Sequence, residues 1–207
     1  MTVLVLYTKQ HKDNWIGKWQ YSRVRHQIYQ IITVIQKVVS QSDCTCQYIS
    51  IDDLSITSCR ECKASENKVC SYRDPCKFND DADSVSSIIQ KSDSIIIVSA
   101  DGAYEHHDSN LWALFYRMRK KHQTEFVSHD KKPLLNILTY CSKNNYTGFY
   151  NADGIRQCKN LFNIIDCINI TEMNEAYMIP AVEHAIYHFI KNYDNYTEYG
   201  FKHRRID

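Results

Sequence analysis

Short, continuous runs of apolar residues alternate along this chain with longer stretches of helical periodicity. The most apolar runs are residues 3–7 (VLVLY), 94–98 (SIIIV) and 134–138 (LLNIL). Unbroken runs of this length are typical of strands buried on both faces, as in parallel sheets covered by helices. Two wetter runs, residues 44–51 and 164–170, predict the remaining strands. The pattern therefore predicts a strand followed by a helix, five times over.

Helical periodicity is clearest at residues 22–41, where Ser22 is placed to cap the N-terminus. A short helix is predicted to begin after an N-cap at Asp80 or Asp81, and Pro180 is acceptable only in the first turn of the last helix. The residues predicted to face inward on the four later helices are Val85, Ile88 and Ile89; Leu111, Leu114, Phe115 and Met118; Ile155, Cys158, Leu161 and Phe162; and Val182, Ala185, Ile186, Phe189 and Ile190.

The distribution of polar residues among the strands predicts their order in the sheet. The second and fifth runs are the wettest, so they belong at the edges, which gives the order 2-1-3-4-5. This is a flavodoxin-like α/β fold, a doubly wound parallel sheet with helices on both faces. We expect one domain over residues 1–192, with a cysteine-rich insertion at 57–79 and a polar tail at 193–207.

Charge and hydropathy exclude several classes of protein. The formal net charge is +1, whereas a nucleic-acid-binding protein would carry a concentrated basic excess. No apolar run approaches the roughly 18 residues needed to span a bilayer, and the N-terminus has no basic leader. We therefore expect a cytoplasmic protein with neither a nucleic acid nor a membrane as its partner.

The predicted topology also places a ligand. In an open parallel sheet, ligands bind beyond the carboxyl ends of the strands, where the strand order reverses. The loops that converge there are residues 8–21, 100–108 and 140–150. The first loop leads into a helix N-terminus, which favours an anion. Hydrogen-bond donors for a phosphate in or just after this loop are Thr8, Lys9, Gln10, Lys18 and Ser22.

Four of the nine cysteines fall in a Cys-x2-Cys-x7-Cys-x5-Cys array, formed by Cys59, Cys62, Cys70 and Cys76. Thiolates are soft ligands, and four of them complete the coordination of zinc or of an iron–sulfur cluster. The alternatives are plain thiols or a local disulfide. The remaining cysteines, apart from Cys141, lie on predicted strands or helix faces and are interpreted as small core residues. Cys141 follows the fourth strand, where it could face a ligand.

The stretch from Ser58 to Met118 resembles the NADPH-dependent FMN reductase family, and more narrowly the cysteine-containing branch that includes the iron–sulfur flavoproteins. The resemblance rests on Cys59 and Cys62, on residues 76–81 (CKFNDD) opening a helix, on the strand at 92–99 (SDSIIIVS) and on the helix that runs to Met118. The order and spacing of these motifs agree over about sixty residues, and the order of elements agrees over the whole chain.

The resemblance implies an FMN-binding, NAD(P)H-dependent oxidoreductase or electron-transfer flavoprotein, with a [4Fe–4S] cluster at the four cysteines as an optional addition. Electrons would pass to a small-molecule or protein acceptor, and a homo-oligomer is expected. No general base or nucleophile is assigned, because the flavin does the chemistry. The residues expected to hold the flavin are Thr8, Gln10, Lys18, Ser22, Ser99, Ala100, Asp101, Gly102, Ala103, Tyr104, Tyr140, Cys141 and Ser142.

Two other classes of function stay open. The chain has five glycines where an average composition gives roughly fourteen, and phosphate-cradling loops usually need glycine. This favours a non-catalytic flavodoxin-like scaffold whose cysteine loop binds a metal or a partner protein. A third class is a nucleotide-modifying enzyme that uses Asp80, Asp81, Asp101 or Glu105 as an acid or base, which would require a raised carboxyl pKa. Neighbouring His106 and His107 could bind a metal or donate a proton.

Overall fold

Five parallel strands form a single sheet in the order β2-β1-β3-β4-β5, which confirms the predicted flavodoxin-like topology. This computed structural model describes residues 1–8, 18–59, 76–100, 110–122, 131–140, 161–170 and 173–193. Its elements are β1 (Thr2–Tyr7), α1 (Lys18–Ser40), β2 (Thr45–Ser50), the short 3-10 helix η1 (Ile51–Asp53), α2 (Ala82–Lys91), β3 (Ser94–Ala100), α4 (Asn110–His122), β4 (Lys132–Tyr140), β5 (Phe162–Asn169) and α6 (Glu175–Lys191).

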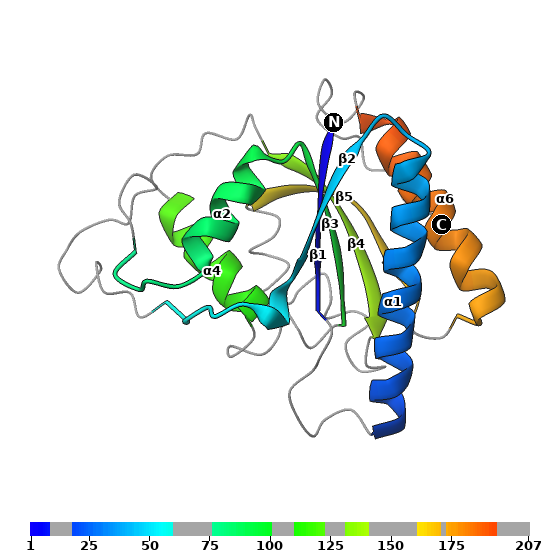
Figure 1. Cartoon of the computed structure of the whole chain (residues 1–207), viewed down its shortest axis with the longest axis horizontal. Helices are drawn as coiled ribbons and strands as arrows, with labels where there is room; N and C mark the ends of the chain where they lie inside the picture. The colour runs from blue at the N-terminus through cyan, green and yellow to red at the C-terminus, as the bar shows by residue number, and fades with distance from the viewer. Residues whose placement is uncertain are drawn as a thin grey trace.

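The helices cover both faces of the sheet. Helices α1 and α6 pack on one face, and α2 and α4 pack on the other (Figure 1). Successive residues of a strand point to opposite faces, so Leu4 and Leu6 of β1 contact the α2 and α4 layer while Val3 and Val5 contact the α1 and α6 layer. The continuous apolar run is therefore explained by a strand that is buried on both sides.

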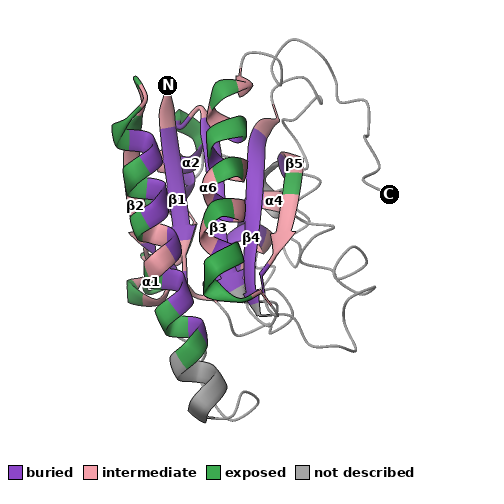
Figure 2. Ribbon diagram, turned by 90° about the vertical axis from the view of Figure 1, so that its right-hand side faces the viewer, coloured by how far each residue is buried: buried purple, intermediate pink, exposed green. Residues whose placement is uncertain are grey.

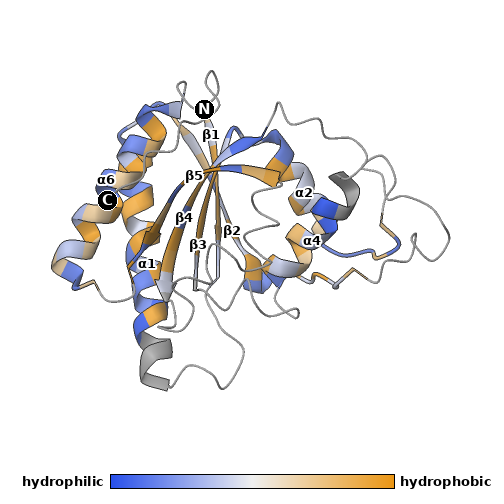
Figure 3. Ribbon diagram, turned by 180° about the vertical axis from the view of Figure 1, so that it is seen from behind, coloured by the Kyte–Doolittle hydropathy of each residue, from blue (hydrophilic) through white to orange (hydrophobic). Residues whose placement is uncertain are grey.

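The difference between central and edge strands follows the predicted distribution of polar residues. Strands β1 and β4 are buried along most of their length, whereas β5 is partly exposed (Figure 2). In β5 the side chain of Asp166 is exposed, and in β2 the exposed residues alternate with partly buried ones. The hydropathy of the ribbon shows the same arrangement, with hydrophobic strands between helices that each carry hydrophilic residues (Figure 3).

The first helix starts earlier than the sequence pattern predicts. Helix α1 begins at Lys18, so Ser22 lies inside the helix and is not its N-cap. The reason is that residues 18–22 (KWQYS) contain no glycine or proline that would stop the helix, so it extends toward β1. The prediction that Ser22 is the N-cap is therefore wrong, and its role as a phosphate donor stays a prediction.

Two further boundaries differ from the prediction. Phe162 was expected on a helix but opens β5, where its ring packs edge-on against Phe115 of α4 at a centroid distance of 5.5 Å. Helix α6 begins at Glu175 after the N-cap Asn174, so Pro180 lies beyond its first turn. Pro180 removes one hydrogen bond to a carbonyl four residues earlier, but that carbonyl belongs to the exposed Ala176, where water can replace the lost donor.

Candidate functional site

Three buried hydroxyl groups gather at the carboxyl ends of the central strands. Thr8 directly follows β1, and Ser99 and Thr139 are the second-to-last residues of β3 and β4. Their exposed fractions are 3%, 0% and 1%, respectively. Among the residues that the structure describes, none of the three hydroxyl oxygens has a hydrogen-bond partner. Thr8 and Ser99 lie where β1 and β3 meet, the reversal point at which the topology places a ligand, and Thr139 lies on the next strand, β4.

The backbone brings Thr8 and Ser99 side by side. The N–H of Thr8 donates to the carbonyl of Val98 at 3.1 Å, which extends the parallel ladder between β1 and β3 by one residue. By the alternation of the strands, Thr8 and Ser99 continue the face of Leu6 and Ile97, the face covered by α2 and α4.

A break in register sets the position of Thr139. Ser99 pairs with Leu138, and Ala100 pairs with Tyr140, so Thr139 is an extra residue in β4. Bulges of this kind redirect a strand locally and are common beside functional sites. The irregularity therefore occurs at the point where β3 and β4 leave the sheet toward their loops.

Burying a hydroxyl without a hydrogen-bond partner costs free energy, and this is why we interpret the three hydroxyls as a binding site. A buried donor or acceptor without a partner costs about 1–3 kcal/mol. Three such groups at one sheet edge form a polar set that a ligand could satisfy. The hydroxyl of Ser50 is also buried without a partner in the described part of the chain, but Ser50 ends the edge strand β2, away from the reversal point, and is not part of this set.

Several predicted flavin-site residues can be placed at this edge, and others cannot. Thr8 and Ser99 belong to the hydroxyl set, Lys18 is the first residue of α1, and Ala100 and Tyr140 end β3 and β4. The N-terminal end of α1 extends beyond the carboxyl ends of the strands (Figure 1). The predicted residues that lie outside the described part of the chain are Gln10, Asp101, Gly102, Ala103, Tyr104, Cys141 and Ser142.

Sequence reasoning missed Thr139. The run at 134–138 was interpreted as a buried strand and Tyr140 as a flavin contact, but Thr139 between them was not singled out. The available signal was a hydroxyl-bearing residue at the C-terminal end of an otherwise apolar strand. Its burial without a partner becomes visible only in the structure.

A buried ion pair joins α4 to the start of α2, on the face of the sheet that these helices cover. The Nη1 atom of Arg117 donates to both carboxylate oxygens of Asp80, at 2.7 Å to Oδ1 and 2.6 Å to Oδ2. The side chains are 4% and 6% exposed. Burial alone would raise the pKa of Asp80, but hydrogen bonds from Arg117, from the Thr57 N–H and from the Ala82 N–H outweigh it and hold that pKa below its ordinary value.

This pair bears on the third class of function. A carboxylate acting as general acid or base near neutrality needs a raised pKa, whereas the pKa of Asp80 is lowered. The carboxylate of Asp81 accepts a hydrogen bond from the Ser55 N–H at 2.7 Å, and the N–H of Asp81 donates to the Ser55 carbonyl at 3.0 Å. Asp81 occupies the N-cap position of α2 without a side-chain capping bond. Asp101 and Glu105 lie outside the described residues.

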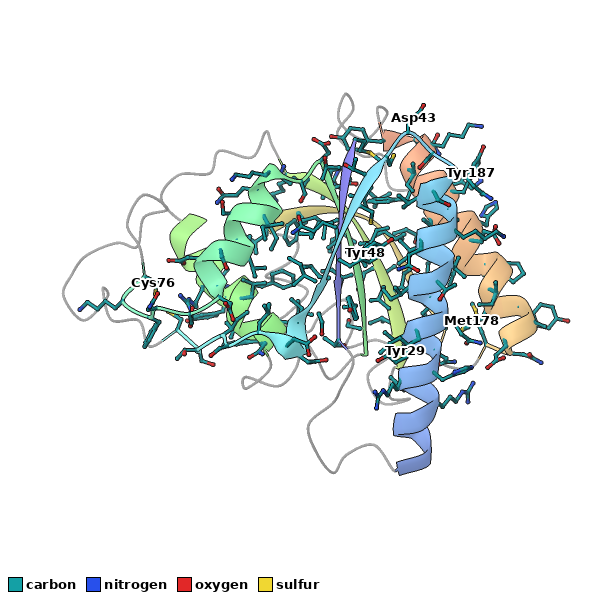
Figure 4. All side chains as sticks on the ribbon, in the orientation of Figure 1. Tyr29, Asp43, Tyr48, Cys76, Met178 and Tyr187 are labelled. Atoms are coloured by element: carbon teal, nitrogen blue, oxygen red, sulfur yellow. The ribbon has the colours of Figure 1, made fainter. Side chains whose placement is uncertain are left out.

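The same contacts fix both ends of the cysteine-rich segment. The Thr57 N–H donates to Asp80 Oδ2 at 2.8 Å, and the Thr57 carbonyl accepts from Arg117 at 3.3 Å. At the other end, the N–H of Cys76 donates to Asp83 Oδ2 at 2.9 Å. These contacts hold the two ends of the segment to the fold, and we call them its closed base. Cys76 lies on the side of α2 and α4 that is away from the sheet (Figure 4).

Only part of the predicted metal site can be examined. Cys59 and Cys76 are partly buried and form no disulfide with another described residue. Cys62 and Cys70 lie outside the described residues, as do His106 and His107. Within the described ranges, no group of three or more histidine, cysteine, aspartate or glutamate side chains is arranged to hold a metal ion. The four-cysteine site stays a prediction.

The cysteines interpreted as core residues pack as expected where they are described. Cys44 and Cys46 of the β2 region contact the α1 and α6 core, and Cys167 of β5 contacts the opposite one. Burial raises the pKa of the Cys46 thiol, against a smaller opposing effect of its hydrogen bond with Tyr48. These three cysteines therefore act as packing residues at the margins of the two cores. Cys141 and Cys158 lie outside the described residues.

No protein-family model and no curated protein matches the chain by sequence. Solved structures do match it. A flavone reductase superposes with a TM-score of 0.58 at 8% identity, over 98% of this chain and 66% of its own. An NAD(P)H:quinone oxidoreductase from Methanothermobacter marburgensis gives 0.59 at 10% identity, over 99% of both chains. An azoreductase from Bacillus anthracis str. Sterne gives 0.53 at 7% identity, over 96% of this chain and all of its own.

At these identities the likeness shows the fold. It extends over nearly the whole chain, in agreement with the five-stranded sheet and its strand order. None of the described helices is both long enough and apolar enough to cross a bilayer.

Proposed function

We propose that this chain is a flavin-binding oxidoreductase that holds FMN at the carboxyl edge of β1, β3 and β4. The observation that carries the proposal is the set of three buried hydroxyls, Thr8, Ser99 and Thr139, which have no hydrogen-bond partner among the described residues and lie at the ends of strands β1, β3 and β4, at and beside the strand-order reversal. The fold likeness supports it, because the similar structures are a flavone reductase, an NAD(P)H:quinone oxidoreductase and an azoreductase. NADH or NADPH would supply electrons, and a small molecule or a protein would accept them.

The described residues suit such a ligand in two ways. Hydroxyl groups can donate to or accept from the polar atoms of a flavin, and burial of Thr8, Ser99 and Thr139 keeps water from competing. The start of α1 at Lys18 lies beyond the same edge, and a helix N-terminus favours a phosphate through its unpaired N–H groups and its dipole. The other predicted flavin contacts, among them Gln10, Tyr104 and Ser142, remain part of the proposal.

The contribution of the chain is positioning and exclusion of water. Bound FMN would supply the chemistry, which is hydride acceptance from a nicotinamide followed by electron delivery to the acceptor. Leu6 and Ile97, which precede Thr8 and Ser99 on the same face of the sheet, are fully buried, so the apolar side of the site is closely packed and dry. We assign no acid, base or nucleophile among the described residues.

The cysteine-rich segment enters the proposal as an optional second centre. The four cysteines Cys59, Cys62, Cys70 and Cys76 would hold a [4Fe–4S] cluster or a zinc ion. The support is the cysteine spacing alone. If the segment carries metal and the chain binds no flavin, the scaffold function replaces the reductase.

The test is a spectrum followed by a reduction. Protein purified under argon is examined by ultraviolet and visible absorption, with iron and zinc measured on the same sample. The proposal predicts the two bands of a bound flavin, directly or after incubation with FMN, and their bleaching by NADH or NADPH. A quinone should then restore the bands.

Two controls make the result specific. Free FMN with NADPH and no protein gives the background rate, and heat-denatured protein shows whether the released flavin is FMN. Added broad absorbance with iron would place a cluster in the protein. Protein that neither carries nor takes up FMN, whatever its metal content, would contradict the proposal.

A further inference from the structure

We propose that His184 and His188, on the outer surface of α6, form a binding site for a divalent transition-metal ion. The two Nε2 atoms face each other at 3.0 Å. The ring centroids are 4.2 Å apart, with the ring planes inclined at 54°. Both residues are exposed, so the open side of the pair is available to a metal ion and to water.

The helix accounts for this convergence. Residues four apart lie on the same face of an α-helix, about one turn from each other. His184 and His188 have this spacing within α6, which runs from Glu175 to Lys191. The pairing therefore needs no contribution from a loop or from another element, and the helix fixes both Cα positions before any metal arrives.

The separation of the nitrogens matches what one metal ion requires. With metal–nitrogen bonds of about 2.0–2.1 Å, two ligands of the same ion lie about 2.9 Å apart in a square arrangement and about 3.4 Å apart in a tetrahedral one. The observed 3.0 Å lies within this range. In the metal-free protein the two nitrogens are within hydrogen-bond distance of each other, and a metal ion bound by both would take the place of that contact.

The chemistry selects the class of ion. Imidazole nitrogen suits zinc, copper and nickel, whereas calcium and magnesium prefer oxygen ligands. The pair also lies in the C-terminal half of α6, where the helix dipole favours a positive charge. Two protein ligands leave the remaining positions to water, which makes this an open site.

The neighbouring charged groups already have partners. Glu183, the acidic residue next to the pair, binds Nζ of Lys37 in α1 at 2.8 Å. Lys191 lies with its Nζ 5.5 Å from the ring centroid of Tyr187, which itself stacks edge-on with His188. We therefore assign no third protein ligand among the described residues.

The site is separate from the proposed flavin site. Helix α6 starts after β5 at the carboxyl edge of the sheet and runs back toward the opposite edge, so Tyr187 lies at the far end of the molecule from the N-terminal end of α1 (Figure 4). The inference does not rest on the proposed reductase, and either can fail without the other.

The experiment is calorimetric titration with nickel chloride of the whole protein and three variants, H184A, H188A and H26A. His26 is the matched control, because it is also exposed but lies on α1, with its Nε2 3.5 Å from Glu175. We expect one binding component of the wild type to be lost in both H184A and H188A and kept in H26A. Loss of a ligand should weaken this component by at least the roughly 10–100-fold seen for loss of a second-shell partner.

Nickel bound by cysteines or by other histidines remains in every variant, so only the difference between titrations is assigned to the pair. Far-ultraviolet circular dichroism checks that α6 is intact in each variant. A nickel component unchanged in H184A and H188A would overturn the inference. So would a component lost in only one of them, or no nickel binding by the wild type at millimolar metal.

Discussion

Arg117 of α4 reaches across to Asp80, the residue before α2's N-cap, and one nitrogen of its guanidinium contacts both carboxylate oxygens at 2.7 and 2.6 Å. Because Asp80 also accepts the N–H of Thr57, the pair joins three parts of the chain that are distant in sequence. These parts are α4, the residue that precedes α2's N-cap, and the segment after β2 that contains Thr57. The ion pair is therefore a central contact of the closed base of the cysteine-rich segment, beside the hydrogen bonds of Asp81 with Ser55 and of Cys76 with Asp83.

The first prediction concerns the stability supplied by the pair. Replacing Arg117 by Met leaves Asp80 charged, 6% exposed and without its main partner. Breaking a buried ion pair in this way costs about 3–5 kcal/mol. Urea denaturation followed by circular dichroism should show R117M less stable than the wild type by this amount.

The matched control is the exposed pair of Lys37 and Glu183, whose nitrogen–oxygen distance of 2.8 Å is similar but whose side chains are 57% and 35% exposed. Surface pairs contribute about 0–1 kcal/mol. K37M should therefore be nearly neutral. A loss for R117M no larger than that for K37M would show that burial adds nothing to the interaction of Arg117 with Asp80.

The second prediction is a dependence on pH. The pKa of Asp80 is lowered in the folded protein, so its ionised form stabilises the fold at every pH above its value in the unfolded chain, about 3.9. This stabilisation is lost as the pH falls through the lower native value. The difference in unfolding free energy between the wild type and D80N should be constant near neutrality and shrink below about pH 4. A difference that grows on acidification would contradict the assigned direction.

Much of the fold follows from local pattern, because a strand buried on both faces has to be apolar throughout. The runs at 3–7 and 94–98 became β1 and β3, and the two wettest runs became the edges of the sheet. The boundaries were less predictable. Ser22 has the chemistry of an N-cap, yet the helix starts at Lys18, since the upstream residues tolerate a helix equally well. Whether a polar residue caps a helix depends on where the preceding chain enters, and periodicity does not report that.

The third prediction concerns Asn110, the first residue of α4. Its Nδ2 donates to the carbonyls of Ile51 and Leu54, at 3.1 and 2.7 Å, and so ties α4 to the segment after β2. N110A should lower the unfolding free energy by about 1–3 kcal/mol, because both carbonyls lose a donor. N110D should be worse than N110A, since a carboxylate cannot donate and repels the carbonyl oxygens.

The measurement is denaturant unfolding of both variants at neutral pH. Asn174 provides a control, because its side chain accepts the N–H of Ala176 as the N-cap of α6, where N174D keeps an acceptor and should be nearly neutral. An N110D protein as stable as the wild type would indicate that Asn110 supplies no donor to these carbonyls.

The fourth prediction separates a ligand site from a packing defect. Thr8 has a buried hydroxyl without a partner in the described part of the chain, so T8V should leave the flavin-free protein as stable as the wild type or make it more stable. If that hydroxyl binds FMN, T8V should weaken FMN binding by about 1–3 kcal/mol. Thermal unfolding of the flavin-free protein and fluorescence titration with FMN measure the two quantities independently.

Ser50 serves as the control for Thr8. Its hydroxyl is also buried without a described partner, but it ends the edge strand β2 and not one of the strands at the reversal point. S50A should change neither stability nor FMN affinity appreciably. If T8V and S50A leave FMN affinity equally unaltered, Thr8 is not a flavin contact.

The candidate site was predictable in position but not in composition. Parallel topology alone places a ligand beyond β1 and β3, and this required no motif. Thr8 and Ser99 were named because they follow those strands, whereas Thr139 emerged only from its burial and from the bulge opposite Ser99 and Ala100. An unsatisfied hydroxyl is a property of three-dimensional packing, so residue type and spacing cannot reveal it.

The most direct test of the central claim is titration of the flavin-free wild-type protein with FMN and, in parallel, with riboflavin, both followed by quenching of flavin fluorescence. The proposal predicts saturable binding of one FMN per chain and at least tenfold weaker binding of riboflavin, because a phosphate at the N-terminus of α1 would contribute on the order of 1.4 kcal/mol or more. Equal affinities for FMN and riboflavin would show that the N-terminus of α1 does not bind the phosphate. Absence of saturable FMN binding would contradict the account as a whole.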